Sequence, residues 1–476
     1  MKSIVEKLLE REAQYQLCEK EINGFQYWQY ERFNVYRYMR QIDGADLGKG
    51  KVNVWQLLKY YLCNSDCLKE RKPIDFCFIS HPRRQFVNGY YECIYTDALA
   101  KKFPASVTLE NFFAKDHFRP IYSKNIIYMD RPIIESEIYE KLMGLFSRKK
   151  RIADQIHREL SVALNGLLKE EQIMKITRHA AGDYYRYKYL RMKFKRILKQ
   201  INPKIVIEVV SYGPKCMIIN EICKDMGILT IELQHGWLGK EHMAYNYASK
   251  GTIRQFPDKI CLFGDYYKTR AAFPISKENL LVTGYPYYER ELQKYSEYKR
   301  QDVRYTVLFL SQGMYAKSLP QMAVDLRKRT RDEEVRILYK LHPIEFHNWQ
   351  QTFPILQEEG IEIIGLKGMS LYECFASSDM QIGAYSTAIY EGLGFGLRTL
   401  IFDQNSEKFA QELIEEGIAE RIESVDDIVE KIRNEEIAVY NTNYFWKRNA
   451  LHNLEQTLRD ELDQVMQSSS EERRER

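Results

Sequence analysis

Polar side chains that could bind a phosphate stand at two places in the C-terminal half of the sequence. Lys340, His342 and Pro343 come at the end of an apolar run, and the proline holds the residue before it in an extended conformation. Ser386 and Thr387 open a predicted helix, where hydroxyls and free amides of the first turn form an anion site. Together these groups could stabilise a nucleotide phosphate or a departing nucleoside phosphate.

Glu391 stands four residues after Thr387, so both would lie on one face of the helix. Its carboxylate could hold ribose hydroxyls, and we place Gln312 and Gly313, which follow another predicted strand, in the same site. The alternative is structural: helix caps, an early-turn acid and a histidine at a strand end. Because the groups follow strands of one predicted sheet, we favour a binding site.

Three residues in the N-terminal half are candidates for a general base, in the order Asp97, His235 and Glu208. Asp97 follows a long loop after the first predicted strand, although an N-cap is its commoner role. His235 lies between Gln234 and Gly236, just after a predicted strand, and an unperturbed histidine exchanges a proton near neutrality. It could equally orient a loop through hydrogen bonds. Glu208 lies within a predicted strand.

Two α/β regions must position these residues. Residues 1–70 are predicted to form short helices, and 134–200 long ones. Strands and helices alternate from 202 to 286 and again from 305 to 403, which predicts two doubly wound parallel sheets. The predicted organisation is a helical segment at 1–70, a Rossmann-like domain at 71–297, a second one at 303–440, a helix at 441–465 that crosses back, and a disordered tail at 466–476.

Composition narrows the class of protein. The chain has 476 residues, a formal charge of +5 and 29% charged residues, so it is globular and nucleic acid is not indicated. Nine scattered cysteines suggest free thiols in a reducing cytosol. We find no signal peptide and no membrane-spanning run. Residues 184–196 alternate basic and aromatic side chains, which suits an anionic membrane face, although a helix whose tyrosines cover the core is favoured.

The motifs resemble those of a known family. Leu341-His342-Pro343, followed by Tyr385-Ser386-Thr387 and Glu391-Gly392, resembles the GT-B glycosyltransferases of bacterial capsule and O-antigen biosynthesis. The likeness is to the group with His-Pro and Ser/Thr motifs, which includes sialyltransferases, polysialyltransferases and Kdo transferases. Gln234-His235-Gly236 is similar to a tripeptide of surface-carbohydrate biosynthesis proteins. The resemblance covers roughly residues 200–403.

The resemblance implies a GT-B fold, in which two Rossmann-like domains face a central cleft, with extra N-terminal helices. It implies that His342, Pro343, Ser386 and Thr387 hold the donor nucleotide. The implied activity is an inverting, metal-independent sugar transfer to a surface polysaccharide or glycolipid. The acidic motif that supplies the base in some sialyltransferases is not evident in the N-terminal half.

We therefore expect no metal and no cofactor beyond a nucleotide-sugar co-substrate, with a CMP-sugar favoured. The expected partners are this donor, a polysaccharide or glycolipid acceptor and the inner face of the membrane, in a cytoplasmic location. Three alternatives stay open: a CDP-alditol phosphotransferase of a teichoic-acid-like polymer, a nucleotide-sugar epimerase, and an inactive scaffold of a polysaccharide assembly complex.

Overall fold

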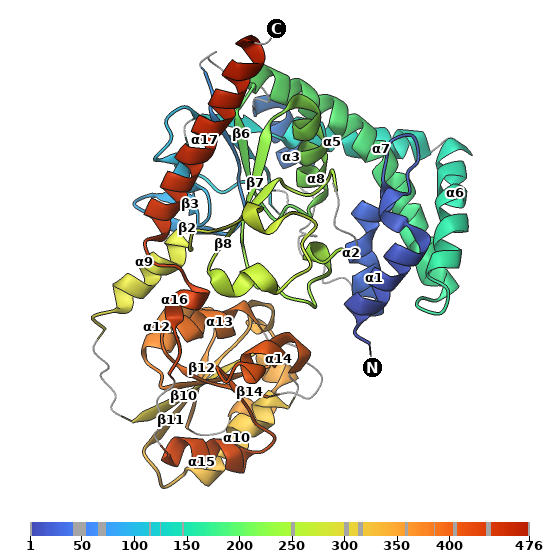
Figure 1. Cartoon of the computed structure of the whole chain (residues 1–476). Coiled ribbons are helices and arrows are strands. Elements are labelled where there is room, and N and C mark those ends of the chain that lie inside the picture. Colours follow the sequence, from blue (N-terminus) through green and yellow to red (C-terminus); the bar gives the residue numbers. More distant parts are fainter. Residues whose placement is uncertain are drawn as a thin grey trace. The chain divides into compact units, whose positions relative to one another are not determined.

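A computed structural model gives the structure of the chain (Figure 1). It describes residues 2–40, 54–64, 73–113, 116–123, 125–144, 147–248, 253–298, 304–312, 318–357, 360–384, 386–402, 407–434 and 439–474.

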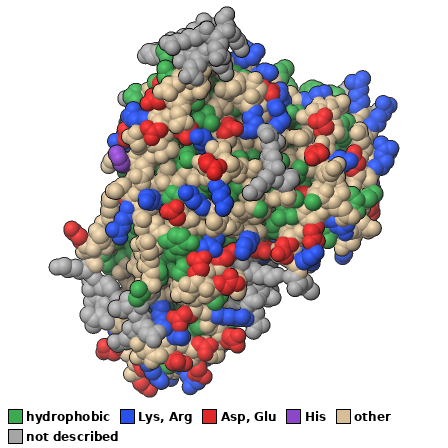
Figure 2. All heavy atoms as spheres, in the orientation of Figure 1, with side chains coloured by type: hydrophobic (Ala, Val, Ile, Leu, Met, Phe, Trp, Pro, Cys, Tyr) green, Lys and Arg blue, Asp and Glu red, His purple; other side chains and the backbone are tan. Residues whose placement is uncertain are grey.

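Contacts divide the chain into two units. The N-terminal unit comprises Met1–Leu262, Lys268–Thr283 and Ala450–Arg476, and the C-terminal unit comprises Phe263–Tyr267 and Gly284–Asn449. The chain therefore leaves the N-terminal unit and later returns to it. Over the face in Figure 2, basic and acidic side chains are intermixed, in keeping with the small net charge.

A parallel seven-stranded sheet forms the centre of the N-terminal unit, in the order β5-β4-β1-β6-β7-β8-β9. The strands are β1 (Phe76–Ile79), β4 (Ser106–Glu110), β5 (Ile126–Tyr128), β6 (Ile205–Val209), β7 (Leu229–Leu233), β8 (Lys259–Leu262) and β9 (Leu280–Val282). The strand order changes direction between β1 and β6, and open parallel sheets bind ligands at such a switch point. A separate antiparallel hairpin consists of β2 (Arg84–Val87) and β3 (Tyr90–Cys93).

The helices of this unit pack on the two faces of the sheet or on one another. They are α1 (Ile4–Tyr15), α2 (Tyr27–Met39), α3 (Val54–Cys63), α4 (Asp97–Ala100), α5 (Asp130–Gly144), α6 (Ser147–Ala163), α7 (Glu170–Ile201), α8 (Pro214–Met226) and α17 (Ala450–Arg474). Strand side chains alternate between faces, so Cys77 and Ile79 join the core formed with α1, α2, α7 and α8. Phe76 points the other way and contacts Phe103, whose ring lies beneath Arg459 of α17.

The C-terminal unit repeats this plan with a parallel six-stranded sheet in the order β12-β11-β10-β13-β14-β15. Its strands are β10 (Tyr305–Leu310), β11 (Val335–Lys340), β12 (Ile361–Ile364), β13 (Met380–Gly383), β14 (Arg398–Ile401) and β15 (Glu420–Arg421). Its helices are α9 (Pro286–Tyr295), α10 (Leu319–Arg329), α11 (Trp349–Thr352), α12 (Leu371–Ala376), α13 (Thr387–Gly394), α14 (Glu407–Glu415), α15 (Val425–Arg433) and α16 (Thr442–Phe445). The switch point lies between β10 and β13.

The predicted α/β class, with two doubly wound parallel sheets and extra N-terminal helices, is confirmed. The boundaries differ from the predicted ones. Residues 284–297 belong to the C-terminal unit because Tyr288 packs on Trp446, with ring centroids 4.0 Å apart. Residues 450–476 group with the N-terminal unit, and α17 continues to Arg474, through most of the tail predicted to be disordered. No helix in the described ranges is both long and apolar enough to cross a membrane.

Candidate functional site

The predicted nucleotide-binding residues of the C-terminal unit gather at the carboxyl edge of its sheet. Gln312 follows β10, His342 follows β11 and Ser386 follows β13, and these three strands are neighbours. Gln312 and Ser386 therefore flank the switch point between β10 and β13. Gly313 lies outside the described residues.

His342 is held in one orientation by the short 3-10 helix that begins at Pro343. Its backbone amide donates to Glu345 Oε2 at 2.8 Å, and its Nδ1 accepts from the amide of Ile344 at 3.3 Å. Burial lowers the pKa of His342, against the opposing effect of Glu345. A neutral ring whose Nδ1 accepts must carry its proton on Nε2. The imidazole thus offers an Nε2–H donor at the strand end.

Lys340 occupies the end of β11. Its Nζ donates to the carbonyl oxygens of Gly365 at 3.3 Å and Met369 at 3.2 Å. Burial lowers its pKa, and no carboxylate forms an ion pair with it among the residues the structure describes. Its positive charge is therefore not neutralised locally and would favour an anion.

Ser386 is the N-cap of α13, with its Oγ accepting from the amide of Ala388 at 3.1 Å. Two glycines set the close packing of this helix on β13. A Cβ on Gly392 would stand 2.0 Å from Gln381 Oε1, and one on Gly383 would stand 3.2 Å from Ile389. The capped N-terminus, which begins at Thr387, is thus drawn in to the switch point, and its dipole favours negative charge there.

Glu391 shares a helical face with Thr387 but borders a cluster of buried tyrosines. Its charge contributes to the raised pKa values of Tyr288 and Tyr372, for which burial is the larger cause. Tyr288 donates its hydroxyl to the backbone carbonyl of Glu391. The predicted contact of Glu391 with ribose stays a prediction.

The N-terminal unit has its own switch point, where β1, β6 and β7 end side by side in His81, Tyr212 and His235. Tyr212 Oη lies 3.3 Å from His235 Nε2. Tyr95 donates its hydroxyl to the His235 carbonyl at 2.8 Å. Burial, followed by the charges of His235 and Arg83, lowers the pKa of His81 to about 3, so that ring is neutral.

An acid lies beneath His235. Glu232 is fully buried in β7, and its Oε1 lies 3.7 Å from His235 Nδ1. The same oxygen accepts from Tyr245 Oη at 2.6 Å and from the amide of Ser211 at 3.2 Å. Sequence reasoning missed Glu232 because it stands in an apolar strand, although it precedes the histidine by three residues. A carboxylate in this position can orient an imidazole that takes up a proton.

Val210 directly follows β6 at this switch point and has a φ of 60°. A β-branched residue rarely adopts the left-handed conformation, which costs about 1–3 kcal/mol. The bend points the amide of Ser211 at Glu232. Strain of this kind is often found at binding and catalytic sites.

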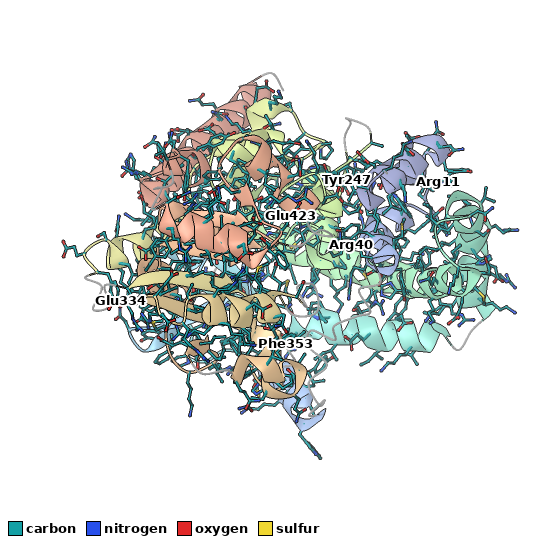
Figure 3. The ribbon with its side chains drawn as sticks, turned by 90° about the horizontal axis from the view of Figure 1, so that it is seen from below. Arg11, Arg40, Tyr247, Glu334, Phe353 and Glu423 are labelled. Atoms are coloured by element: carbon teal, nitrogen blue, oxygen red, sulfur yellow. The ribbon has the colours of Figure 1, made fainter. Side chains whose placement is uncertain are left out.

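The N-terminal helices support the loop behind His235. Arg32 of α2 is buried, pairs with Glu12 of α1 at 2.7 Å, and donates to the carbonyls of Met243 at 2.9 Å and Asn246 at 2.6 Å. Its guanidinium lies 3.9 Å from the ring centroid of Tyr247, labelled in Figure 3. The first two helices therefore hold the loop that contains Tyr245.

The other two base candidates are buried and do not join His235. Asp97 accepts from the amide of Cys93 at 2.8 Å and lies 3.9 Å from Arg84, and burial raises its pKa. Glu208 accepts from Asn220 at 2.8 Å. Burial and the nearby charge of Glu232 raise the pKa of Glu208 to about 8, so it is protonated at neutral pH.

A buried polar network that the sequence did not reveal lies at the ends of β4 and β5. Glu110 accepts from Arg84 at 2.6 Å and from Ser80 at 2.5 Å, and His117 lies 2.9 Å from Asp130. His117 Nδ1 and Asp130 Oδ1 lack hydrogen-bond partners within the described ranges. Such atoms would be satisfied by water or by a polar ligand.

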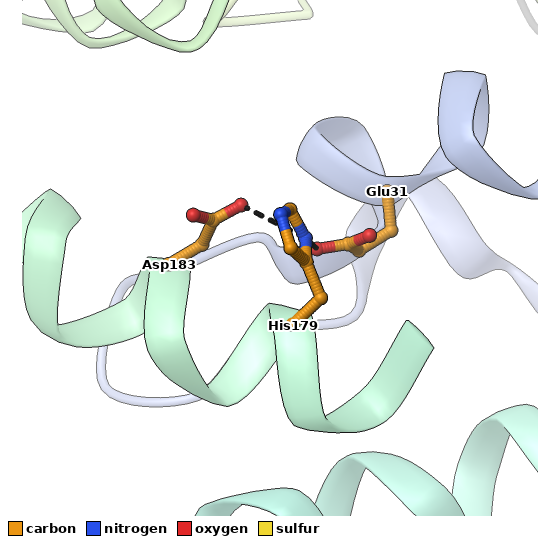
Figure 4. A group of neighbouring side chains, drawn as sticks. All are labelled: Glu31, His179 and Asp183. Carbon is orange, nitrogen blue, oxygen red and sulfur yellow. Dashed lines mark hydrogen bonds and ion pairs between the residues drawn. The ribbon is translucent and has the colours of Figure 1, made fainter. Parts of the chain in front are cut away.

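Glu31, His179 and Asp183 also bring metal-ligating groups together (Figure 4). His179 Nδ1 lies 2.8 Å from Glu31 and 3.4 Å from Asp183, while Arg186 donates to Asp183. The bond to Glu31 raises the pKa of His179 to about 9. The group is therefore an ion-pair network that joins α2 to α7.

The two edges suit different chemistry. In the C-terminal unit an ammonium group, an imidazole N–H and a helix N-terminus can stabilise an anion. In the N-terminal unit His235 and Glu232 form a pair that can accept a proton.

No protein-family model and no curated protein matches the chain. Similar solved structures include UDP-GlcNAc 2-epimerase from Neisseria meningitidis bound to UDP-GlcNAc, with 12% identity and a TM-score of 0.46 over 81% of this chain and 99% of that one. A putative UDP-N-acetylglucosamine 2-epimerase from Listeria monocytogenes has 12% identity and a TM-score of 0.47, over 83% and 98%. The wall teichoic acid polymerase TagF has 12% identity and a TM-score of 0.41, over 92% and 91%. These neighbours have GT-B-like folds, and the likeness concerns the fold alone.

Proposed function

We propose that the protein is a glycosyltransferase that takes a sugar from a nucleotide-sugar donor and transfers it, with inversion and without a metal ion, to a surface polysaccharide or glycolipid. The observation that supports the proposal is that Lys340 and His342, at the end of β11, and the Ser386-capped helix, after β13, stand at the same carboxyl edge of the C-terminal sheet. The donor would bind to this unit and the acceptor to the N-terminal unit.

In this reaction an acceptor hydroxyl attacks the anomeric carbon while the bond to the nucleotide phosphate breaks. The proposed base is His235, because its partly accessible ring has a buried carboxylate 3.7 Å from Nδ1 and the hydroxyl of Tyr245 3.4 Å from the same atom. The base takes the hydroxyl proton, and the groups around His342 stabilise the negative charge that develops on the leaving phosphate. We retain a CMP-sugar as the favoured donor, on the resemblance of the His-Pro and Ser/Thr motifs.

Nucleotide binding to the full chain tests the donor site. CMP, CDP, UDP and GDP are titrated by calorimetry into the wild type, His342→Ala and His347→Ala. His347 is an exposed histidine of the same unit, so it controls for loss of an imidazole. We expect one nucleotide to bind, and His342→Ala to weaken it by more than about 1.4 kcal/mol, or tenfold, while His347→Ala has no effect.

The same series separates the alternatives. CMP selectivity supports a CMP-sugar donor, and CDP selectivity points to a CDP-alditol phosphotransferase. Turnover of a UDP-sugar without any acceptor would identify an epimerase. Failure of all four nucleotides to bind would overturn the enzyme proposal and favour a scaffold.

A further inference from the structure

An apolar surface lies on α3 and α5, two helices that contact each other. We call it the α3–α5 patch, defined by Trp55, Leu58, Leu62, Ile138 and Leu142. Trp55 is 79% exposed and Leu62 63%, and each of the other three is between 43% and 53% exposed. Large apolar side chains this exposed on two helices that contact each other indicate an interaction surface.

Helical geometry shows why these side chains face outward together. Trp55, Leu58 and Leu62 are spaced three and four residues apart, so they form one stripe along α3. Tyr60 is buried and anchors the opposite side of the helix. Ile138 and Leu142 continue a stripe of α5 that begins at Arg131 and Glu135.

Hydrogen bonds fix α3 against α5, so the patch is a defined surface. Tyr61 donates its hydroxyl to Glu135 at 2.9 Å. Arg131 donates to the backbone carbonyls of Tyr61 at 2.5 Å and Leu62 at 3.1 Å. The guanidinium of Arg131 thus stands next to the apolar stripe of α3.

A cationic pocket of about 420 Å³ adjoins the patch. Arg131, Lys193 and Arg196 line it together with Tyr61 and Glu135. Glu135 pairs with Lys193 at 2.9 Å, which leaves an excess of positive charge. A pocket of this charge beside an apolar surface complements a lipid phosphate whose acyl chains lie next to the apolar side chains.

We propose that the α3–α5 patch docks on an anionic phospholipid bilayer, with the cationic pocket receiving a lipid phosphate. The apolar patch lies outside the basic aromatic segment 184–196 that the sequence suggested, although Lys193 and Arg196 of that segment line the pocket. Tyr184, Tyr185 and Tyr187 of the basic aromatic segment in α7 are buried and cannot enter a membrane. The proposal does not depend on the donor chemistry of the C-terminal unit.

Vesicle flotation of the full chain tests the proposal, with phosphatidylcholine vesicles compared with mixed phosphatidylcholine and phosphatidylglycerol vesicles. We expect binding to the anionic vesicles. The double change Trp55→Ser and Leu62→Ser should weaken it at least about tenfold, because exposed apolar area no longer enters the bilayer. Arg196→Gln should weaken it about fivefold. Leu366→Ser, at a leucine that is 71% exposed in the C-terminal unit, is the matched control and should bind like the wild type.

Fluorescence then tests whether the patch itself enters the bilayer. Brominated phosphatidylglycerol should quench tryptophan emission, and Trp55→Phe should abolish the quenching while preserving flotation. Because Trp55 is exposed, these variants should keep the wild-type unfolding curve. Absence of flotation, equal binding to neutral vesicles, or quenching that survives Trp55→Phe would each overturn the proposal.

Discussion

Replacing the buried Arg32 with methionine should destabilise the N-terminal unit severely. The Arg32 side chain is 2% exposed, and methionine fills similar space without the charge. Four donations disappear: two to Glu12, one to the carbonyl of Met243 and one to that of Asn246. Among the residues that the structure describes, Glu12 then keeps the indole of Trp28 as its side-chain donor, at 2.8 Å.

The magnitude follows from what is left behind. Breaking a buried ion pair by removing one partner costs about 3–5 kcal/mol. Two carbonyls without donors add about 1–3 kcal/mol each where water cannot reach them. We therefore expect Arg32→Met to lower the free energy of unfolding by at least about 5 kcal/mol, a large part of the stability of an ordinary domain.

Urea denaturation followed by far-ultraviolet circular dichroism measures the effect. Arg11→Met is the control, because that arginine is partly exposed and donates weakly to Gln14 and Asn165. It should change the unfolding free energy by less than about 1 kcal/mol. The double variant Glu12→Gln with Arg32→Met should regain about 2 kcal/mol, because the stranded charge is gone while an acceptor for Trp28 remains. A single variant as stable as the Arg11 control, or a double variant no better than the single, would refute the reasoning.

Three further predictions concern the two edges and the ion-pair network. Gly392→Ala should destabilise the C-terminal unit by about 1–3 kcal/mol and weaken nucleotide binding, because the added Cβ collides with the buried Gln381; denaturation and calorimetry measure both effects. The His179 ion pair should stabilise the fold fully below pH 6.5 and lose this contribution as pH rises through about 9, because the pKa of His179 is raised in the folded state. In His179→Asn the unfolding free energy, measured by denaturation across this range, should therefore depend less on pH. His235→Gln should lower kcat about 10²–10⁴-fold in a transfer assay, and Glu232→Gln should lower it less, because the carboxylate only orients the ring.

Gly365→Ala is the control for Gly392→Ala. Gly365→Ala meets only ordinary contact, 3.7 Å from Leu341, and should be neutral; equal loss in both glycine variants would contradict the steric argument. If the unfolding free energy of His179→Asn depends on pH as it does in the wild type, the ion pair does not contribute to the pH dependence of stability. Full transfer activity in the His235 variant would remove that residue as the base.

The sequence predicted the fold well because buried parallel strands are continuous apolar runs that end in polar residues. His342 and Ser386 could be placed at one edge for that reason, and the structure puts them there. The sequence was a poorer guide to which polar residues lie close together. Glu232 and His235 are recognisable as a pair only in the folded chain, where the carboxylate lies near the imidazole at the end of β7 and Tyr245 donates to that carboxylate.

Long-range contacts explain the remaining differences. Arg32 meets Met243 across more than two hundred positions, and no local pattern links them. From sequence, Asp97 could be a helix cap or a general base. The structure shows that it is buried beside Arg84, away from His235. The boundary at residue 284 depends on Tyr288 finding Trp446 much later in the chain.

The return of α17 to the N-terminal unit bears on how the protein is made. During synthesis the ribosome completes the whole C-terminal unit before it produces Glu455 and Glu461, the partners of Lys102 and Lys259. The N-terminal unit must therefore wait, with the side of its sheet near α4 uncovered, until translation has passed Ala450. A premature stop or a proteolytic cut just before Ala450 would leave the C-terminal unit whole. It would instead remove α17 from the N-terminal unit, although most of that unit is encoded first.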